Sequence, residues 1–364
     1  MQQSPGSWPF RFELIDGCRG IAALVVVMHH LGILTLGHYA VMIFFVISGY
    51  CIGAAAESGR RSGMSFPAFM ARRVRRIYPP YLLAIAFFVV TRLIKRAQGG
   101  HNDLARPWTD WVQNLTLTQW VSLPLHPVAA ATQNPKLMVA AFWSLNYEEQ
   151  FYLIMAVGVL LAVRLRLPLI PAAVTLGAAG LLWNLIWPAG WITGVFIEYW
   201  AHFAIGVLLF AVLCLWPARA VRIAFVAGGV ALLTFCLFRI LPWTASTELH
   251  GRAYAELAVV AAFALFLFAA RPVSAVVSQH VLWRPIAGLG AISYSLYLVH
   301  QFNLTVVQDA ARLVPAGLPV VRLTAMVALE IAIATVFWYC CERPFLNRRT
   351  AVASRPMTGL IQVP

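Results

Sequence analysis

The sequence predicts an all-α polytopic membrane protein, a bundle of about ten transmembrane helices. Of its 364 residues, 61% are hydrophobic and only 11% are charged, and the mean hydropathy is +0.77. Soluble enzymes carry more charge than this. Ten apolar segments approach the ~20 residues that cross a bilayer. They lie at 18–36, 38–56, 79–96, 147–164, 168–187, 195–216, 221–240, 254–271, 289–308 and 320–341.

The first apolar segment carries Arg19 and, eleven residues later, His30. At about 100° and 1.5 Å per residue, the two side chains share one helix face and lie about 16 Å apart along the axis. Ionisable residues at membrane depth usually face the protein interior or a water-filled path. An imidazole can take a proton from an alcohol, so His30 is a candidate catalytic residue. His29 projects about 100° away and either orients its neighbour or lines the bundle.

A basic segment, RRVRRIYPPY, leads into the third apolar segment from a polar connection over 57–78. On a helix, Arg72, Arg73 and Arg76 form one guanidinium face. Guanidinium forks match phosphate oxygens, so this face is a candidate phosphate-binding site. Anchoring to lipid headgroups explains the same cluster, and both alternatives remain open from the residues alone. Tyr78, in the same segment, is a possible supporting residue.

A long connection at about 97–142 carries several Trp residues among polar ones and is predicted to be an external loop. Connections of this length are commonly functional or disordered. We expect one membrane domain over 1–348, followed by a cytoplasmic tail over 349–364.

Adjacent carboxylates, Glu148 and Glu149, occur in WSLNYEEQFYL where the fourth apolar segment begins. A charged pair that enters hydrocarbon needs partners. One carboxylate could reach a histidine ring nitrogen and fix its tautomer, which makes both residues catalytic candidates. A solvated helix start explains the same dipeptide.

Other polar residues occur inside or at the ends of apolar segments, in FFVISGY, ISYSLYLVHQ and ERPF. Hydroxyl groups in membrane helices commonly bond to the backbone or bridge helices. We regard Ser48, Tyr294 and His300 as possible supporting residues, and of these His300 could take part in chemistry. The six cysteines show no metal-ligand spacing, so no metal site is predicted.

The charge distribution predicts the orientation. With an even number of spans and both termini in the cytoplasm, 18 of the 27 Lys and Arg residues lie on that side, as the positive-inside rule favours. The net charge of +14 also favours contact with anionic membrane lipids. The arginines are scattered among the spans, which argues against nucleic-acid binding.

Six segments together resemble the membrane acyltransferase 3 family, and they occur in the family's order over residues 16–345. They are DGCRGIAALVVVMHH, FFVISGY, RRVRRIYPPY, WSLNYEEQFYL, ISYSLYLVH and ERPF. The resemblance implies an enzyme of the bacterial cytoplasmic (inner) membrane with no permanently bound cofactor. Such an enzyme uses cytoplasmic acyl-CoA, commonly acetyl-CoA, to acylate a hydroxyl of a glycan or lipid-linked saccharide in or across the membrane.

Carried over by position, Arg19 and His30 match the family's first-helix pair, and the later arginines and carboxylates match its basic and acidic motifs. The resemblance thus implies that Arg19, Arg72, Arg73 and Arg76 bind acyl-CoA and that His30, Glu148 and Glu149 are catalytic. The doubled histidine departs from the pattern at His29. Three alternatives stay open: a transporter or flippase without acyl chemistry, a lipid-binding scaffold, and acylation of a hydrophobic glycosylated small molecule.

Overall fold

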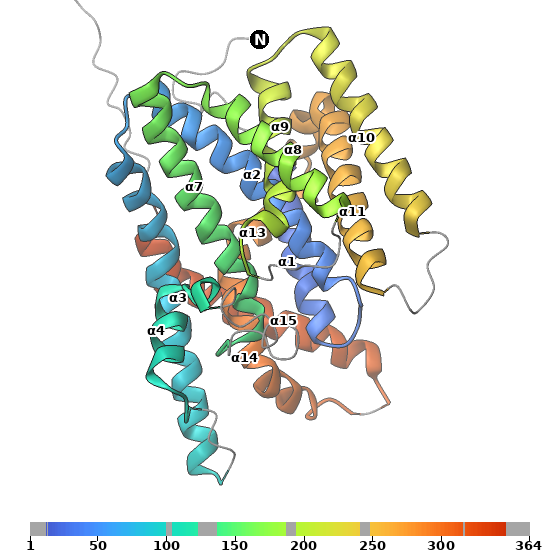
Figure 1. Cartoon of the computed structure of the whole chain (residues 1–364). Coiled ribbons are helices and arrows are strands. Elements are labelled where there is room, and N and C mark those ends of the chain that lie inside the picture. The colour runs from blue at the N-terminus through green and yellow to red at the C-terminus, as the bar shows by residue number, and fades with distance from the viewer. Residues whose placement is uncertain are drawn as a thin grey trace, which may run out of the picture.

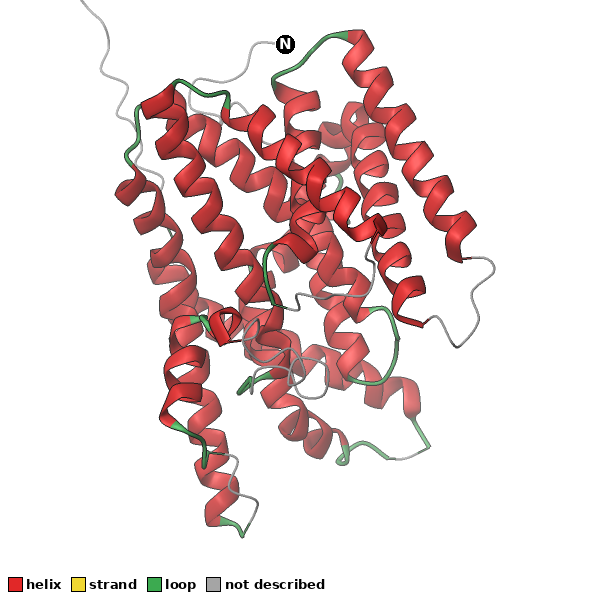
Figure 2. Cartoon of the chain, in the orientation of Figure 1, coloured by secondary structure: helices red, strands yellow, loops and turns green. Residues whose placement is uncertain are grey.

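The computed structural model describes residues 12, 14–99, 104–122, 137–186, 194–240, 248–315 and 317–346. These residues form helices joined by loops, and no strand occurs among them (Figure 2). The predicted all-α class is therefore confirmed. The predicted tail over 349–364 lies outside the described residues, as do residues 100–103 and 123–136 of the predicted external loop.

Ten long helices make up most of the described part of the chain, and Figure 1 shows their arrangement. They are α1 (Leu14–His30), α2 (Gly37–Arg61), α3 (Phe66–Ala97), α7 (Trp143–Leu165), α8 (Leu169–Ile186), α9 (Ile197–Cys214), α10 (Arg219–Ile240), α11 (Glu248–Ala270), α14 (Ser293–Ala311) and α15 (Pro319–Phe337). The short elements are α4 (Trp108–Thr116), α5 (Gln119–Ser122), η2 (Ala140–Phe142), η4 (Arg271–Val273), α12 (Ser274–Gln279), α13 (Trp283–Ala291), η5 (Trp338–Glu342) and η6 (Arg343–Phe345).

Seven helical segments of the described chain are long and apolar enough to cross a membrane. They comprise α2, α3, α8, α9, α10, residues 252–279 from α11 into α12, and residues 319–345 from α15 onward. The long helices α1, α7 and α14 are not among them. These three carry polar side chains of the site described below. The count of about ten spans therefore remains a prediction.

The centre of the bundle is the contact between α2 and α9, where two glycines let the backbones approach closely. A Cβ added to Gly49 would lie 2.0 Å from the carbonyl oxygen of Phe203, and one added to Gly206 would lie 2.0 Å from that of Val46. Small residues at such crossings are typical of helices packed in membranes. The approach fixes α2 beside the aromatic side chains of α7 and α9.

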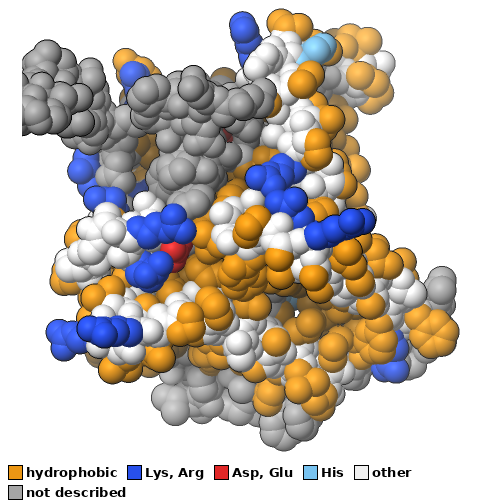
Figure 3. Space-filling model, turned by 90° about the horizontal axis from the view of Figure 1, so that it is seen from above, with side chains coloured by type: hydrophobic (Ala, Val, Ile, Leu, Met, Phe, Trp, Pro, Cys, Tyr) orange, Lys and Arg blue, Asp and Glu red, His pale blue; other side chains and the backbone are white. Residues whose placement is uncertain are grey.

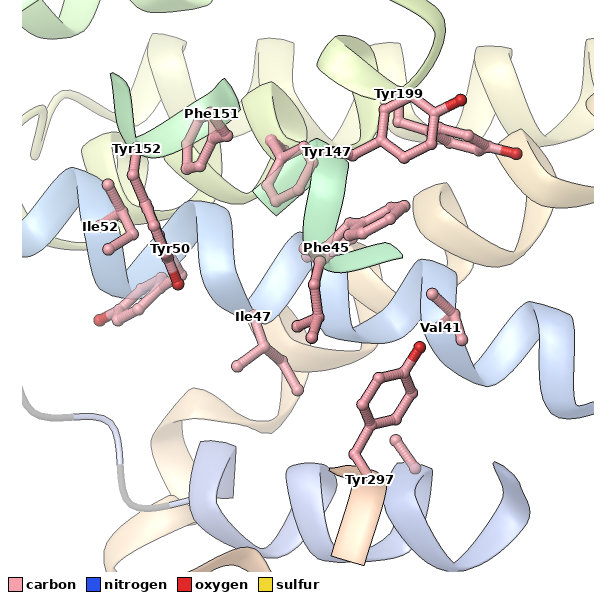
Figure 4. Packing of buried hydrophobic residues seen from close by; sticks show 14 of the residues in the cluster. Val41, Phe45, Ile47, Tyr50, Ile52, Tyr147, Phe151, Tyr152, Tyr199 and Tyr297 are labelled. Atoms are coloured by element: carbon pink, nitrogen blue, oxygen red, sulfur yellow. The ribbon is translucent and has the colours of Figure 1, made fainter. Parts of the chain in front are cut away.

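Aromatic side chains fill the space between α2, α7 and α9 (Figure 4). The ring centroids of Phe45 and Phe203 are 4.5 Å apart, and those of Tyr147 and Tyr199 are 4.7 Å apart. Edge-to-face and offset contacts at such distances are favourable beyond the area they bury. This packing holds one wall of the candidate site rigid.

Helix α10, at the edge of the bundle beside α11 (Figure 1), has only one buried residue, Cys236. Large apolar side chains such as Phe238, which is 71% exposed, cover its outer side. An apolar exposed face of this kind suits contact with lipid.

One end of the bundle is rich in arginine. Helix α2 ends there at Arg61, the last turn of α7 carries Arg164, and α10 begins there at Arg219. Seen from above, groups of Lys and Arg side chains surround apolar surface at this end (Figure 3). We call it the basic end and its opposite the outer end. That the basic end faces the cytoplasm remains a prediction.

Candidate active site

A cavity of about 90 Å³ lies between α1, α2, α3, α7 and α14. Three of its lining residues are arginines, Arg19 from α1 and both Arg73 and Arg76 from α3, and one is a carboxylate, Glu148 from α7. Hydroxyl groups complete the polar part of the lining. They belong to Ser48, Ser144, Tyr152, Ser293, Tyr294 and Tyr297.

The three arginines give the cavity an excess of positive charge. Among the described residues, no carboxylate lies within salt-bridge distance of Arg19, Arg73 or Arg76. The buried Nε of Arg73 also has no hydrogen-bond partner there. A buried guanidinium without a partner is costly, so the cavity is suited to an anionic group that brings its own acceptor oxygens.

Glu148 is held inside the cavity by two hydroxyl groups. Its Oε1 accepts a hydrogen bond of 2.9 Å from Ser48 Oγ and another from the hydroxyl of Tyr152. Tyr152 follows Glu148 by four residues and so lies on the same helix face. This spacing is the signal by which Tyr152 could have been found in the sequence. The sequence prediction omitted it.

Glu149 lies outside the main cavity because adjacent helical residues project about 100° apart. It lines a smaller cavity of about 30 Å³, where it accepts a hydrogen bond from the hydroxyl of Tyr78. Its Oε2 is buried without a partner among the described residues. Glu148 thus lines both cavities, whereas Glu149 lines only the smaller one.

His30 lies at the outer end of α1, away from the lining of the main cavity. Its Nδ1 is 3.0 Å from the carbonyl oxygen of Val26. A carbonyl can only accept, so Nδ1 donates and the neutral ring keeps a free lone pair on Nε2. The ring packs edge-on against His300, with centroids 4.8 Å apart. His30 thus has the tautomer that a general base needs.

The predicted hydrogen bond from a histidine to Glu148 or Glu149 does not form in the described part of the chain. Among the described side chains, Glu148 and Glu149 bond only to hydroxyl groups, and His30 bonds to its own helix. Arg19 and His30 do share helix α1. The eleven-residue spacing that aligns them also separates them by about 16 Å along the axis, so Arg19 reaches the cavity and His30 does not.

A chain of contacts joins the histidines to the cavity. His300 is buried, its Nδ1 donates to the carbonyl oxygen of Tyr297 at 2.9 Å, and its Nε2 has no partner among the described residues. Its ring centroid is 5.8 Å from that of Tyr297, whose hydroxyl lies 2.7 Å from Ser144 Oγ. Because Tyr297 and Ser144 both line the cavity, His30 and His300 lie just beyond the outer end of the cavity.

The other predicted residues divide between the cavity and its surroundings. Tyr294 lines the cavity and donates to the carbonyl oxygen of Ile77 at 3.0 Å, beside two prolines of α3. Arg72 is exposed and lies outside the cavity lining, so the expected face of three guanidinium groups is reduced to Arg73 and Arg76. His29 donates from Nδ1 to the carbonyl oxygen of Leu34 at 3.0 Å, which stabilises the turn after α1.

The ERPF segment is hydrogen-bonded to the start of α14. Glu342, the last residue of a π-helical turn, is 3% exposed and accepts hydrogen bonds from Ser295 N at 3.1 Å and Ser295 Oγ at 2.5 Å. This contact ties the two late motifs, ISYS and ERPF, to each other. Its role in holding α14 beside the cavity was missed in the sequence because the two residues are 47 positions apart.

A family model described as an acyltransferase domain matches residues 12–339, nearly the whole chain. The chain belongs to this acyltransferase 3 family. Most of the cavity lining comes from five of the six motifs that carry the resemblance. No solved structure matches it.

Three relatives are each 26% identical to this chain. The exopolysaccharide production protein ExoZ of Rhizobium meliloti (strain 1021) matches over 337 residues, 89% of this chain and 93% of ExoZ. BcsY of Komagataeibacter xylinus, provisionally named a membrane-bound transacylase, matches over 351 residues, 94% of this chain and 85% of BcsY. YrhL of Bacillus subtilis (strain 168), provisionally named a peptidoglycan O-acetyltransferase, matches over 311 residues, 79% of this chain and 47% of YrhL. The chain thus spans about half the length of some relatives.

Proposed function

We propose that the protein is an integral-membrane O-acyltransferase that moves an acyl group, expected to be acetyl, from cytoplasmic acyl-CoA to a hydroxyl of a glycan or lipid-linked saccharide. The observation that carries this proposal is the distribution of charge along α1. Unpaired guanidinium groups gather at Arg19, and an imidazole with a free Nε2 lies three turns further, at His30. The guanidinium groups can bind phosphates, and the imidazole can accept the proton of a hydroxyl group.

In this proposal Arg19, Arg73 and Arg76 hold the phosphates of the donor from the basic end. The pantetheine arm would extend along the cavity toward the histidines. Ser48 and Tyr152 both donate to Glu148 in the cavity wall, so we assign Glu148 a positioning role. Arg72 would contribute only long-range attraction, because it lies outside the cavity.

The acyl transfer itself requires one proton acceptor. The acceptor oxygen would bond to the thioester carbonyl carbon while Nε2 of His30 takes the hydroxyl proton. The C–S bond would then break, leaving an O-acyl ester and a thiolate that recovers the proton. In a second form of the same proposal, Nε2 carries the acyl group transiently before the hydroxyl attacks.

The names of the relatives support a glycan acceptor, because ExoZ is named for exopolysaccharide production and YrhL for peptidoglycan. We further propose that both termini and the basic end face the cytoplasm of a bacterial inner membrane. Donor and acceptor would then enter from opposite ends of the bundle.

The test uses the full-length protein in lipid nanodiscs with acetyl-CoA and neutral oligosaccharides released from the host cell envelope. We expect release of coenzyme A together with a mass increase of one acetyl group per modified oligosaccharide. A transporter or scaffold would bind or move ligands without forming the ester. Absence of both coenzyme A and ester in active preparations would therefore overturn the proposed function.

A further inference from the structure

A second polar cluster lies at the outer end of the bundle and has no part in the donor cavity. It consists of His38 near the start of α2, Trp143 at the start of α7, and Arg252 and Glu256 on α11. We call these four residues the outer cluster. The side chain of Arg252 is 53% exposed and that of Glu256 is 8% exposed, so the cluster extends from the surface into the bundle.

The members of the outer cluster hold one another in fixed positions. Nε2 of His38 donates to Oε1 of Glu256, and Nη2 of Arg252 donates to Nδ1 of His38 at 2.8 Å. Nε of Arg252 lies 3.3 Å from the same carboxylate oxygen. The indole of Trp143 stacks on the imidazole, with ring centroids 5.5 Å apart and an interplanar angle of 15°. Both nitrogens of His38 are therefore occupied, which excludes it as a base and makes it a positioning residue.

Polar atoms without partners remain beside this network. Oε2 of Glu256 has no hydrogen-bond partner among the described side chains. His202 of α9 is 2% exposed, and neither of its ring nitrogens is bonded there. Its ring lies 5.2 Å from that of Tyr199, which in turn lies 5.6 Å from that of Trp143. Buried polar atoms are ordinarily bonded, so the two ring nitrogens of His202 indicate a polar occupant. Oε2 of Glu256 is not among the buried unbonded atoms of the described residues, so it can accept a hydrogen bond from such an occupant.

One face of α2 joins the outer cluster to the donor cavity. His38, Val41, Phe45 and Ser48 fall within an arc of about 80° on this helix, and the last three line the cavity. The start of α2 also packs against the histidine end of α1, because a Cβ added to Gly37 would lie 2.5 Å from the ring of His29. The outer cluster therefore continues the cavity face along α2, and His38 directly follows the glycine that packs against His29, the residue before the candidate base.

We propose that the outer cluster binds a sugar ring of the acceptor and presents its hydroxyl to His30. This inference rests on the proposed function and adds a site to it. A carboxylate and a guanidinium side by side can accept from and donate to neighbouring hydroxyl groups, while Trp143 offers an apolar wall to the ring. The charges of Arg252 and Glu256 cancel, so the cluster suits a neutral saccharide, whereas the donor cavity suits an anion.

The test compares Arg252→Gln and Glu256→Gln with the unchanged protein in nanodiscs. Neutral oligosaccharides released from the host cell envelope are applied without acetyl-CoA, and those retained are quantified by mass spectrometry. Each variant removes a charged hydrogen-bonding group, so we expect retention to fall at least about tenfold. Binding of acetyl-CoA, measured by titration, should stay within about twofold of the unchanged protein.

Glu330→Gln is the matched control, because Glu330 is a fully buried carboxylate that lines neither cavity. We expect it to retain oligosaccharides as the unchanged protein does. Equal retention by all variants, no retention by the unchanged protein, or a parallel loss of acetyl-CoA binding in the variants would overturn the inference. If oligosaccharides bind through the cluster and no ester forms, the acyl-transfer proposal fails and the binding site stands.

Discussion

Replacing Arg76 by Gln should raise the KM for acetyl-CoA by about 10- to 100-fold, because the variant loses one charge-assisted hydrogen bond worth about 1.5–3 kcal/mol. The structure supplies the reason for expecting a large effect. Arg76 lines the cavity, and no described carboxylate lies within salt-bridge distance of it. Its guanidinium is therefore free to bind a phosphate of the donor. Initial rates of coenzyme A release at varied acetyl-CoA measure the KM.

Arg72→Gln is the matched control for this prediction. It removes the same charge from the same motif, yet Arg72 is exposed and outside the cavity. An exposed change of this kind should move the KM by no more than about twofold. Anchoring to lipid headgroups predicts comparable losses in both variants, since either arginine could contact the membrane surface.

The donor provides the second control. Acetyl-pantetheine lacks the nucleotide phosphates, so Arg76→Gln should leave its KM within about twofold of the unchanged protein. Arg76→Lys should restore the KM for acetyl-CoA only in part, because an ammonium lacks the planar fork. A loss of equal size with both donors would refute the phosphate role of the cavity.

Three further predictions address the base, the packing and the orientation. His30→Ala should lower the rate of ester formation by about 10²- to 10⁴-fold while acetyl-CoA still binds; His29→Ala should be milder, and the reverse order would mean that the wrong imidazole was chosen. Gly206→Ala should cost about 1–3 kcal/mol of stability, because its Cβ would lie 2.0 Å from a carbonyl oxygen of α2; an unchanged midpoint of thermal unfolding in detergent would contradict this packing. In a protein without its native cysteines, Ser62→Cys should be labelled from the cytoplasm and Trp108→Cys from outside; labelling of both from one side would exclude the proposed orientation.

Much of the site could be anticipated from single segments. On a helix, the eleven-residue spacing places Arg19 and His30 on one face, and both residues lie in α1. Helical spacing likewise predicts that Arg73 and Arg76 act together, and both line the cavity. Arg72 was predicted to share their face but lies outside the cavity. Residue spacing gives only the angle of a side chain around α3 and does not show which helix packs at that angle.

The carboxylates show the limit of this reasoning. The sequence allowed Glu148 or Glu149 to reach a histidine, but Glu148 bonds to Ser48, 100 residues earlier. Within the described part of the chain, a histidine that does meet a carboxylate is His38, whose partner, Glu256, is 218 residues away. Neither residue was a candidate, since each is unremarkable within its own segment.

The sequence by itself determined the helical class, the apolar segments and which polar residues within one segment share a helix face. These properties depend on composition and on a repeat of 3.6 residues per turn, both of which are local. Only the tertiary structure decided which polar groups meet. The decisive contacts are between helices, where close approaches such as Gly49 against Phe203 fix the rotation of each helix and hence the partner of every side chain on its faces.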